Sequence, residues 1–197
     1  MKNEFKIIAN LLPPRSRVLD VGCGDGTLIE ALINEKNIDA RGIELGKDNV
    51  KKCISKGLSV IEGNAETELH QFPNKAFDFV ILSQTLQAFY QPENVLEQLL
   101  RIGNRVIISI PNFGYWQIRA KLLFFGKMPI TNSLPYSWYN TPNLHMCSIK
   151  DFYQFCNKKK IKMNIIIGIN GEKTSSIYRI NLEIKNLFSE VGIFLIS

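Results

Sequence analysis

One stretch near the N-terminus, RVLDVGCGDGTLIEAL (residues 17–32), constrains the fold more than any other part of the chain. An apolar run over residues 18–21 predicts a buried strand, although Asp20 lies inside it. Three glycines follow at every second position, Gly22, Gly24 and Gly26, and a helical apolar pattern comes next. Glycine is needed where φ is positive or where a ligand approaches the main chain closely. A strand that turns through glycines into a helix also directs free backbone N–H groups toward a ligand. The stretch therefore predicts a ligand-binding turn.

The alternation of apolar runs and helical patterns continues as far as residue 111. Strands are predicted in residues 40–45, 58–63, 77–83 and 105–111, and helices in residues 48–57 and 92–103. This order is typical of a parallel sheet with helices on both faces. Two later apolar runs, residues 163–169 and 191–196, predict a late antiparallel hairpin. We therefore expect an α/β, Rossmann-like fold with a mostly parallel sheet.

Residues 113–148 break this rhythm. They are rich in aromatic residues, proline and asparagine, and contain one short apolar helix candidate in residues 118–125. A long irregular segment inside a compact domain is usually a functional loop or lid, and the aromatic residues argue against disorder. A helix is predicted again from residue 150 to 158. We interpret residues 1–197 as a single domain with an aromatic-rich insertion at about 113–148.

Composition excludes several classes of function. No apolar run reaches the roughly 18 residues that a membrane span needs, and the charged N-terminus does not read as a signal peptide. We therefore expect a cytoplasmic protein without membrane association. The net charge is +6, but the densest basic run has no interleaved aromatic residues, so no nucleic-acid binding is predicted. Cys23, Cys53, Cys147 and Cys156 form no CxxC pair, which predicts reduced thiols and no metal site.

The glycine spacing narrows the choice of ligand. G-x-G-x-G departs from the G-x-G-x-x-G dinucleotide pattern, and no GK[ST] follows, which excludes a Walker loop. Glu44 ends the second predicted strand, 22 residues after Gly22. A carboxylate there can accept both hydroxyls of a ribose, because the second strand ends beside the turn of the first. Together the two features predict a nucleoside ligand, although Glu44 could also be purely structural.

The combination of VLDVGCGDG and GIE resembles the first motif and the acidic second-strand end of the class I S-adenosylmethionine-dependent methyltransferases. The resemblance implies S-adenosylmethionine or S-adenosylhomocysteine as ligand. Asp20 would order the turn and the ammonium group, and Glu44 would hold the ribose. The other residues implied in binding this ligand are Gly22, Cys23, Gly24 and Gly26 at the turn, Asn64 and Ala65 after the third strand, and Ser83 after the fourth.

Longer stretches resemble one family within that superfamily, the methionine-biosynthesis protein MetW. They include FDFVILSQTLQAF, the segment from LEQLLRIG to WQIR, GKMPITNSLPYSWYNTPNLHMCSIKDFYQFC and INGEK. These motifs are more specific than the glycine turn, and the resemblance covers about residues 17–172. It implies a role in methionine synthesis together with a homoserine O-acyltransferase as partner.

Two functions from different classes remain open. One is a methyltransferase that acts on a small acceptor; the other is a binding module that supports or regulates the acyltransferase. Alignment of methyl and acceptor does most of the work in methyl transfer, and a base helps only for protonated acceptors. No Asp, Glu, Lys or His directly follows the fourth strand, which favours the module and leaves Gln84 and His145 as the catalytic candidates. The residues predicted to face an acceptor or a partner are Trp116, Tyr136, Trp138 and Tyr139.

Overall fold

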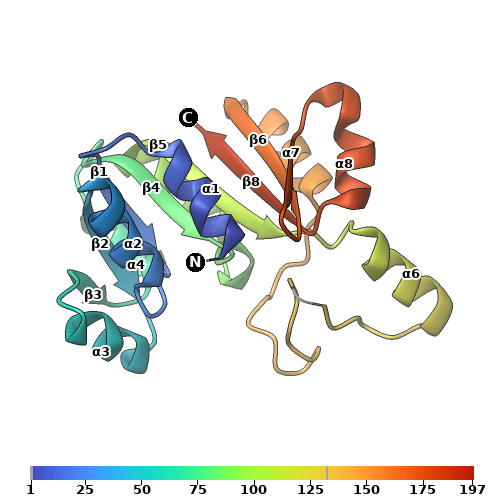
Figure 1. Cartoon of the computed structure of the whole chain (residues 1–197), viewed down its shortest axis with the longest axis horizontal. Coiled ribbons are helices and arrows are strands. Elements are labelled where there is room, and N and C mark those ends of the chain that lie inside the picture. Colours follow the sequence, from blue (N-terminus) through green and yellow to red (C-terminus); the bar gives the residue numbers. More distant parts are fainter. Residues whose placement is uncertain (1, 132) are drawn as a thin grey trace.

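A computed structural model describes residues 2–131 and 133–197 (Figure 1). Eight strands form one sheet in the order β3-β2-β1-β4-β5-β8-β6-β7. The five strands that come first in the sequence pair in parallel, and the three later ones pair antiparallel. Helices cover both faces of the sheet. The predicted α/β class and mostly parallel sheet are confirmed.

The elements follow the predicted order closely. The strands are β1 (Arg17–Val21), β2 (Asp39–Glu44), β3 (Val60–Glu62), β4 (Phe77–Ser83), β5 (Gly103–Pro111), β6 (Met163–Asn170), β7 (Lys173–Ser176) and β8 (Val191–Ile196). The helices are α1 (Asn3–Leu11), α2 (Thr27–Lys36), α3 (Lys47–Ser55), α4 (Ala65–Glu68), α5 (Pro92–Ile102), α6 (Trp116–Phe125), α7 (Ile149–Lys158) and α8 (Leu182–Phe188).

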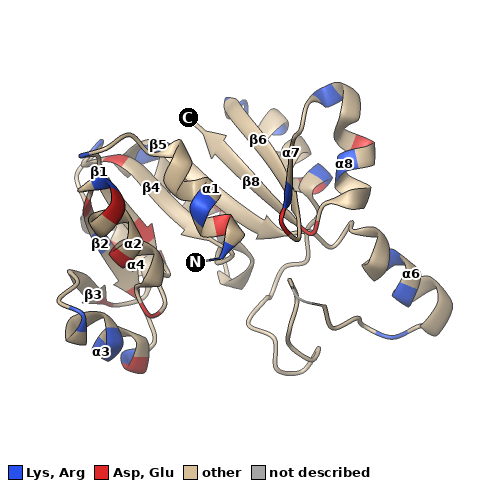
Figure 2. Cartoon of the chain, in the orientation of Figure 1, with Lys and Arg blue, Asp and Glu red and all other residues tan. Residues whose placement is uncertain are grey.

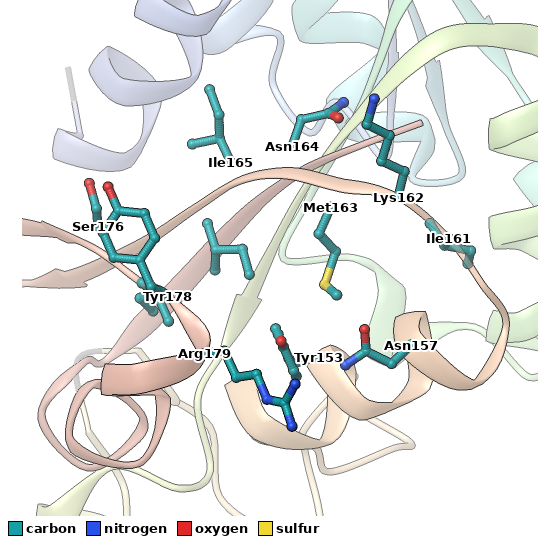
Figure 3. Close-up of a pocket in the computed structure, with 12 residues that line it drawn as sticks. Tyr153, Asn157, Ile161, Lys162, Met163, Asn164, Ile165, Ser176, Tyr178 and Arg179 are labelled. Carbon is teal, nitrogen blue, oxygen red and sulfur yellow. The ribbon is translucent and has the colours of Figure 1, made fainter.

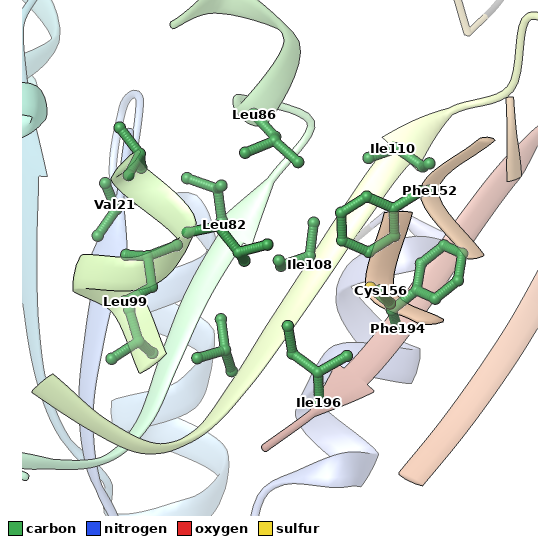
Figure 4. Close-up of a cluster of buried hydrophobic side chains, with 14 of the residues drawn as sticks. Val21, Leu82, Leu86, Leu99, Ile108, Ile110, Phe152, Cys156, Phe194 and Ile196 are labelled. Atoms are coloured by element: carbon green, nitrogen blue, oxygen red, sulfur yellow. The ribbon is translucent and has the colours of Figure 1, made fainter. Parts of the chain in front are cut away.

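Successive side chains along each strand point to opposite faces of the sheet, so the hydrophobic core is divided between these two faces. On β4, Val80 and Leu82 pack with α5 and α7, whereas Phe79 and Ile81 pack with α1 and α2. Figure 4 shows the first of these clusters, in which side chains of the parallel strands meet Phe152 of α7. Burial on both faces explains why these strands are continuous apolar runs rather than alternating ones. The apolar packing thereby fixes which strand ends lie next to each other.

The late strands confirm the antiparallel hairpin but add to it. β6 pairs with β8 on one side and with β7 on the other. All six residues of β8 are buried, because it lies between β5 and β6. The sequence analysis did not predict β7, whose residues KTSS carry no apolar alternation. Helices α1, α4 and α8 were not predicted either.

The segment after β5 leaves and rejoins the sheet at one point. Asn112 is fully buried, and its amide nitrogen donates to the carbonyl oxygens of Asn186 and Ser189, both at 2.7 Å. Its carbonyl oxygen accepts from the Gly114 and Ile149 N–H groups, at 2.9 and 3.2 Å. These four bonds hold both ends of the insertion against the turn around α8. The insertion then extends away from the sheet with α6, as Figure 1 shows.

Candidate functional site

The glycine turn is closed by backbone hydrogen bonds to the neighbouring strand. Gly22 and Cys23 donate their N–H groups to the Ile43 carbonyl at 2.8 and 3.2 Å, and the Gly26 N–H donates to the Cys23 carbonyl at 3.1 Å. The Gly24 N–H donates to Glu44 Oε2 at 2.8 Å. The end of β2 therefore satisfies the N–H groups of Gly22, Cys23 and Gly24, and the turn offers fewer free N–H groups than expected.

The three glycines are required for different reasons. All have positive φ, of 74° at Gly22, 57° at Gly24 and 76° at Gly26. A Cβ at Gly22 would lie 2.7 Å from Thr85 Cγ2, and one at Gly26 would lie 2.5 Å from Leu58 Cδ1. A Cβ at Gly24 would meet no atom within 4 Å. Gly22 and Gly26 thus permit close packing, whereas Gly24 faces open space that a ligand can approach.

Glu44 ties the end of β2 to the turn. Its Oε2 accepts from the Gly24 N–H, and its Oε1 accepts from the Gly46 N–H, also at 2.8 Å. The side chain is half-buried. A carboxylate has about four lone-pair positions, so two backbone donors leave acceptor capacity for ribose hydroxyls. Glu44 can therefore hold the turn in place and still accept hydrogen bonds from a ribose.

Asp20 is the most unusual charged group in the chain. It is 98% buried, and its Oδ1 has no hydrogen-bond partner among the described residues. Burial, followed by the charges of Glu44 and Glu4, raises the pKa of Asp20 to about 7. A buried carboxyl without a partner normally costs stability. A cation placed beside Asp20 would remove much of that cost.

Asp20 lies at a cavity of about 290 Å³ at the carboxyl ends of the parallel strands. This cavity brings together many of the residues predicted from the sequence. They are Asp20, Gly22, Cys23, Gly24 and Ser83, with Gln84 of the catalytic candidates. Gly26, Glu44, Asn64 and Ala65 do not line it. Glu44 is nevertheless bound to the turn that forms its wall.

Asn64 and Ala65 begin the short helix α4. The Asn64 side chain caps that helix by accepting from the Glu66 N–H at 3.0 Å, and it is exposed. Its NH₂ group makes none of the recorded side-chain bonds and can still donate. Ala65 is buried in the core beneath. A role of Asn64 toward adenine stays a prediction.

The sequence analysis did not predict Glu4, which enters the same cavity from α1. It is 93% buried and accepts hydrogen bonds from the Ser83 hydroxyl at 2.8 Å, from the Ser109 hydroxyl and from the Gln84 amide. The signal was available in EFKIIANLL, because Glu4 shares a helical face with the buried Ile8. An acid on the apolar face of a helix indicates a polar environment at that point of the core.

The two catalytic candidates do not come together. Gln84 has a φ of 51°, and its N–H is held by both the carbonyl and the hydroxyl of Ser109, each at 3.0 Å. His145 lines a different, mainly apolar cavity of about 310 Å³, together with Gln87 and Cys147. Burial raises the pKa of the Cys147 thiol to about 11, so it is not a ready nucleophile.

The aromatic residues of the insertion are exposed. Trp116 and Tyr136 are about half exposed, and Trp138 and Tyr139 are about three-quarters exposed. Only Tyr136 among them lines a cavity with the sheet, one of about 510 Å³. The sequence analysis placed the end of helix α6 correctly but did not predict that Leu123, Phe124 and Phe125 are all more than 70% exposed. Four consecutive apolar residues, LLFF, cannot all face one side of a helix, which was the available signal.

Charge sets the insertion apart from the rest of the molecule. Residues 113–148 contain Arg119, Lys121 and Lys127 but no Asp or Glu. Figure 2 shows basic residues along α6 and the loop after it, whereas both signs occur on helices such as α1, α3 and α8. We call the exposed residues Trp116, Leu123, Phe124, Phe125, Trp138 and Tyr139, with these three basic residues, the insertion surface.

Another cavity lies elsewhere. It has a volume of about 640 Å³ and lies between α7 and β6, beside the residues that follow β7. Figure 3 shows Tyr153 and Asn157 of α7 on one side of it and Asn164 and Ile165 of β6 on the other. None of the residues predicted for cofactor, acceptor or partner lines it. Among the described residues, no helix is long and apolar enough to cross a membrane.

Comparison with known proteins decides the family. The model of the family "Methionine biosynthesis protein MetW" matches residues 2–196. This chain belongs to the MetW family. A bifunctional methionine biosynthesis protein MetXA/MetW from Rhodopirellula baltica is 33% identical over 153 residues, which cover 73% of this chain and 25% of that protein. The chain therefore corresponds to only about a quarter of this longer relative.

Solved structures agree with the fold of the family. A SAM-dependent methyltransferase from Thermotoga maritima, described as a possible histamine N-methyltransferase, has a TM-score of 0.69 at 17% identity over 98% of this chain and 87% of that one. A plantazolicin methyltransferase solved with SAH and a triazolic desmethylPZN analog has a TM-score of 0.67 at 15% identity, over 98% of this chain and 84% of that one. At such identities the likeness establishes the fold of class I methyltransferases.

Proposed function

We propose that this MetW-family chain binds S-adenosylmethionine or S-adenosylhomocysteine at the glycine turn. The observation that carries the proposal is Asp20, a buried carboxyl with one unpartnered oxygen at a cavity beside the open side of Gly24. Both ligands have an ammonium group, which is the kind of partner that Asp20 lacks. The methyltransferase fold of the structural neighbours, one of them solved with SAH, supports the same ligand class.

The residues present fit this ligand. Asp20 would face its amino-acid part, Gly24 would permit close approach, and Glu44 would accept the ribose hydroxyls through the lone pairs that its two backbone donors leave free. Asn64 would lie on the adenine side. S-adenosylmethionine, when bound, supplies a methyl group already activated by its sulfonium.

We further propose that the chain acts with a homoserine O-acyltransferase, which it supports or regulates through the insertion surface. A relative in which MetXA and MetW form one bifunctional protein supports a functional link between two such units. The insertion surface supports contact, because exposed Leu123, Phe124 and Phe125 form an apolar group of the kind that protein interfaces bury. Its basic residues favour an acidic partner face.

Methyl transfer to a small acceptor is the second candidate function. The observation that favours it is Glu4, a buried carboxylate at the point where the sequence offered no acid or base. In this case the Glu4 carboxylate could accept a proton from the acceptor.

Calorimetric titration with S-adenosylhomocysteine tests the binding proposal. We expect saturable binding, and the absence of binding to the folded protein would overturn it. For the partner, the activity of a purified homoserine O-acyltransferase is measured with and without this chain, each with and without nucleoside. A change in activity supports the module. Nucleoside binding without any effect on the acyltransferase, together with transfer of labelled methyl to a small acceptor, would favour the enzyme.

A further inference from the structure

The cavity at the glycine turn has a larger neighbour. The neighbouring cavity, of about 510 Å³, is bounded by α1, by the insertion and by the turn between β6 and β7. Lys2, Glu4 and Gln84 line both cavities. The two cavities therefore meet at these three residues, and we call the larger one the insertion cavity.

Glu4 brings to this junction a carboxylate that forms no ion pair with the described residues. Its three hydrogen-bond donors, the hydroxyls of Ser83 and Ser109 and the amide of Gln84, are all neutral. None of the described Lys, Arg or His side chains forms an ion pair with it. The ammonium of Lys2, the cation at the junction, lies 5.6 Å from the centre of the Phe5 ring. A buried carboxylate that is hydrogen-bonded but unpaired favours a cationic ligand.

A second acidic residue and several apolar residues of the insertion cavity indicate which chemical groups the ligand would have besides its cation. Glu190 also lines the insertion cavity. The apolar part of the wall includes Pro135, Tyr136 and Pro142 from the insertion and Ile169 and Val191 from the sheet, whereas Asn3, Ser133 and Asn143 add polar groups. Two carboxylates and a partly apolar wall suit a small molecule that joins an amine to an apolar or aromatic body.

We infer that the insertion cavity is a second binding site, for a small amine whose ammonium group is held by Glu4 and whose apolar part contacts Tyr136. The site extends the proposed function, because it places this amine next to the proposed nucleoside site. In a methyltransferase it would receive the acceptor. In a regulatory module it would let one further metabolite act on α1 and on the insertion together.

Three probes of one shape test the charge preference. Tyramine, 4-ethylphenol and 4-hydroxyphenylacetate share a phenol ring and a two-carbon substituent, and they are cationic, neutral and anionic at pH 7. Dissociation constants are measured by ligand-observed NMR with the full chain, in the absence and presence of S-adenosylhomocysteine. We expect tyramine to bind at least about tenfold more tightly than 4-ethylphenol, the effect of roughly one charge-assisted contact. Equal binding of all three probes, or no binding of tyramine, would overturn the inference.

Two variants locate the site. Glu4→Gln retains the shape of the side chain and should bring the tyramine preference to within about twofold of unity, while 4-ethylphenol binds as before. Tyr136→Ala, at a half-exposed residue, should weaken both probes about equally and leave S-adenosylhomocysteine binding unchanged. A tyramine preference that survives Glu4→Gln would refute the role of Glu4. If S-adenosylhomocysteine does not bind but the wild-type chain prefers tyramine, only the proposed nucleoside site is wrong. If S-adenosylhomocysteine binds but tyramine is not preferred, only the proposed amine site is wrong.

Discussion

The glycine-turn cavity and the insertion differ in which kind of side chain is left without a partner. At the glycine turn, most polar groups have a partner within the fold, and Asp20 Oδ1 is the buried side-chain atom there that has none among the described residues. In the insertion, apolar side chains are left in solvent, and the buried cluster consists of Tyr115, Ile118 and Leu134. The glycine turn therefore has one buried polar atom without a hydrogen-bond partner, whereas the insertion has exposed apolar side chains without a packing partner.

This difference indicates two kinds of ligand. A cavity fixed by strand register and closed by backbone bonds is preorganised, so it suits a small ligand recognised by a few polar contacts. A basic apolar surface on a segment that is held at its ends, by Asn112 and by the Gln87 carbonyl, suits a larger partner that completes its burial. The predictions below test this division of roles, from the largest expected effect to the smallest.

The substitution Gly24→Val should abolish nucleoside binding. Its side chain would enter the open space that the structure leaves beside Gly24, where the ligand would approach. We expect the affinity for S-adenosylhomocysteine to fall by at least about a hundredfold, equivalent to about 2.8 kcal/mol. Isothermal titration calorimetry measures this loss. Binding to the insertion partner should be unaffected.

Gly57→Val provides the matched control. Gly57 also has positive φ, of 73°, and a Cβ there would also meet nothing within 4 Å. Both variants place a branched residue in the left-handed region, which costs on the order of 1–2 kcal/mol of stability. Similar melting temperatures with loss of binding only in Gly24→Val would separate the ligand effect from backbone strain. Equal nucleoside affinity in the two variants would count against the site.

Truncating the insertion surface should weaken the complex with homoserine O-acyltransferase. A few aromatic side chains usually dominate such an interface, each worth roughly 2 kcal/mol or more. We therefore expect about a thirtyfold loss of affinity for Phe124→Ala and for Trp138→Ala, measured by surface plasmon resonance. Nucleoside affinity and melting temperature should remain unchanged, because both side chains are exposed in the free chain.

Ile180→Ala serves as the control for this surface. Ile180 is 95% exposed but lies just before α8, outside the insertion. Its replacement should leave complex formation intact. If Ile180→Ala disrupts the complex and the two insertion variants do not, the partner uses the other end of the molecule and the proposed role of the insertion surface is wrong.

Much of the glycine-turn region could be predicted from the sequence, because its determinants are local. The strand, the three glycines and the helix follow one another within residues 17–32, and parallel pairing then brings Ser83 and Glu44 beside them. The register places Asp20 opposite Gly42 on one side and Ile81 on the other. Periodicity and the order of elements were therefore sufficient to predict that the second strand ends beside the turn, whereas the register comes from the structure.

The misses have a common physical origin. Glu4 reaches the cavity through a contact about 80 residues away in sequence, to Ser83 and Gln84, which no local pattern reports. The N–H groups of Gly22, Cys23 and Gly24 were expected to be free, because the spacing of residues in the sequence does not show how closely β2 approaches the turn. Likewise β7 has a polar edge-strand sequence, and its pairing with β6 is what makes it a strand.

Replacing Glu44 should weaken nucleoside binding less than closing the space beside Gly24. Loss of a charge-assisted hydrogen bond costs about 1.5–3 kcal/mol, so Glu44→Gln should lower the affinity for S-adenosylhomocysteine about twentyfold. The variant also disturbs one of the two backbone contacts, to Gly24 or Gly46. A 2′-deoxy analogue separates the two causes. Wild type should discriminate against it more strongly than Glu44→Gln, and equal discrimination would assign Glu44 to the turn alone.

The smallest expected effect is the pH dependence of nucleoside binding. Burial raises the pKa of Asp20 to about 7, so the carboxyl is about 90% protonated at pH 6 and about 90% ionised at pH 8. A ligand ammonium binds the ionised form. We therefore expect the affinity for S-adenosylhomocysteine to rise about tenfold from pH 6 to pH 8, as measured by calorimetry.

The ligand-free protein should show the opposite trend in stability. A folded-state pKa raised above the ordinary value means that the unfolded chain releases this proton first, so the contribution of protonated Asp20 is lost as pH rises from about 4 to about 7. Asp20→Asn should flatten both profiles, because an amide does not titrate in this range and is close in shape to the acid. An unchanged affinity profile in Asp20→Asn would show that Asp20 does not face the ligand. In that case the polar group left without a partner in the glycine-turn region would have no link to binding, and the contrast with the insertion would lose its basis.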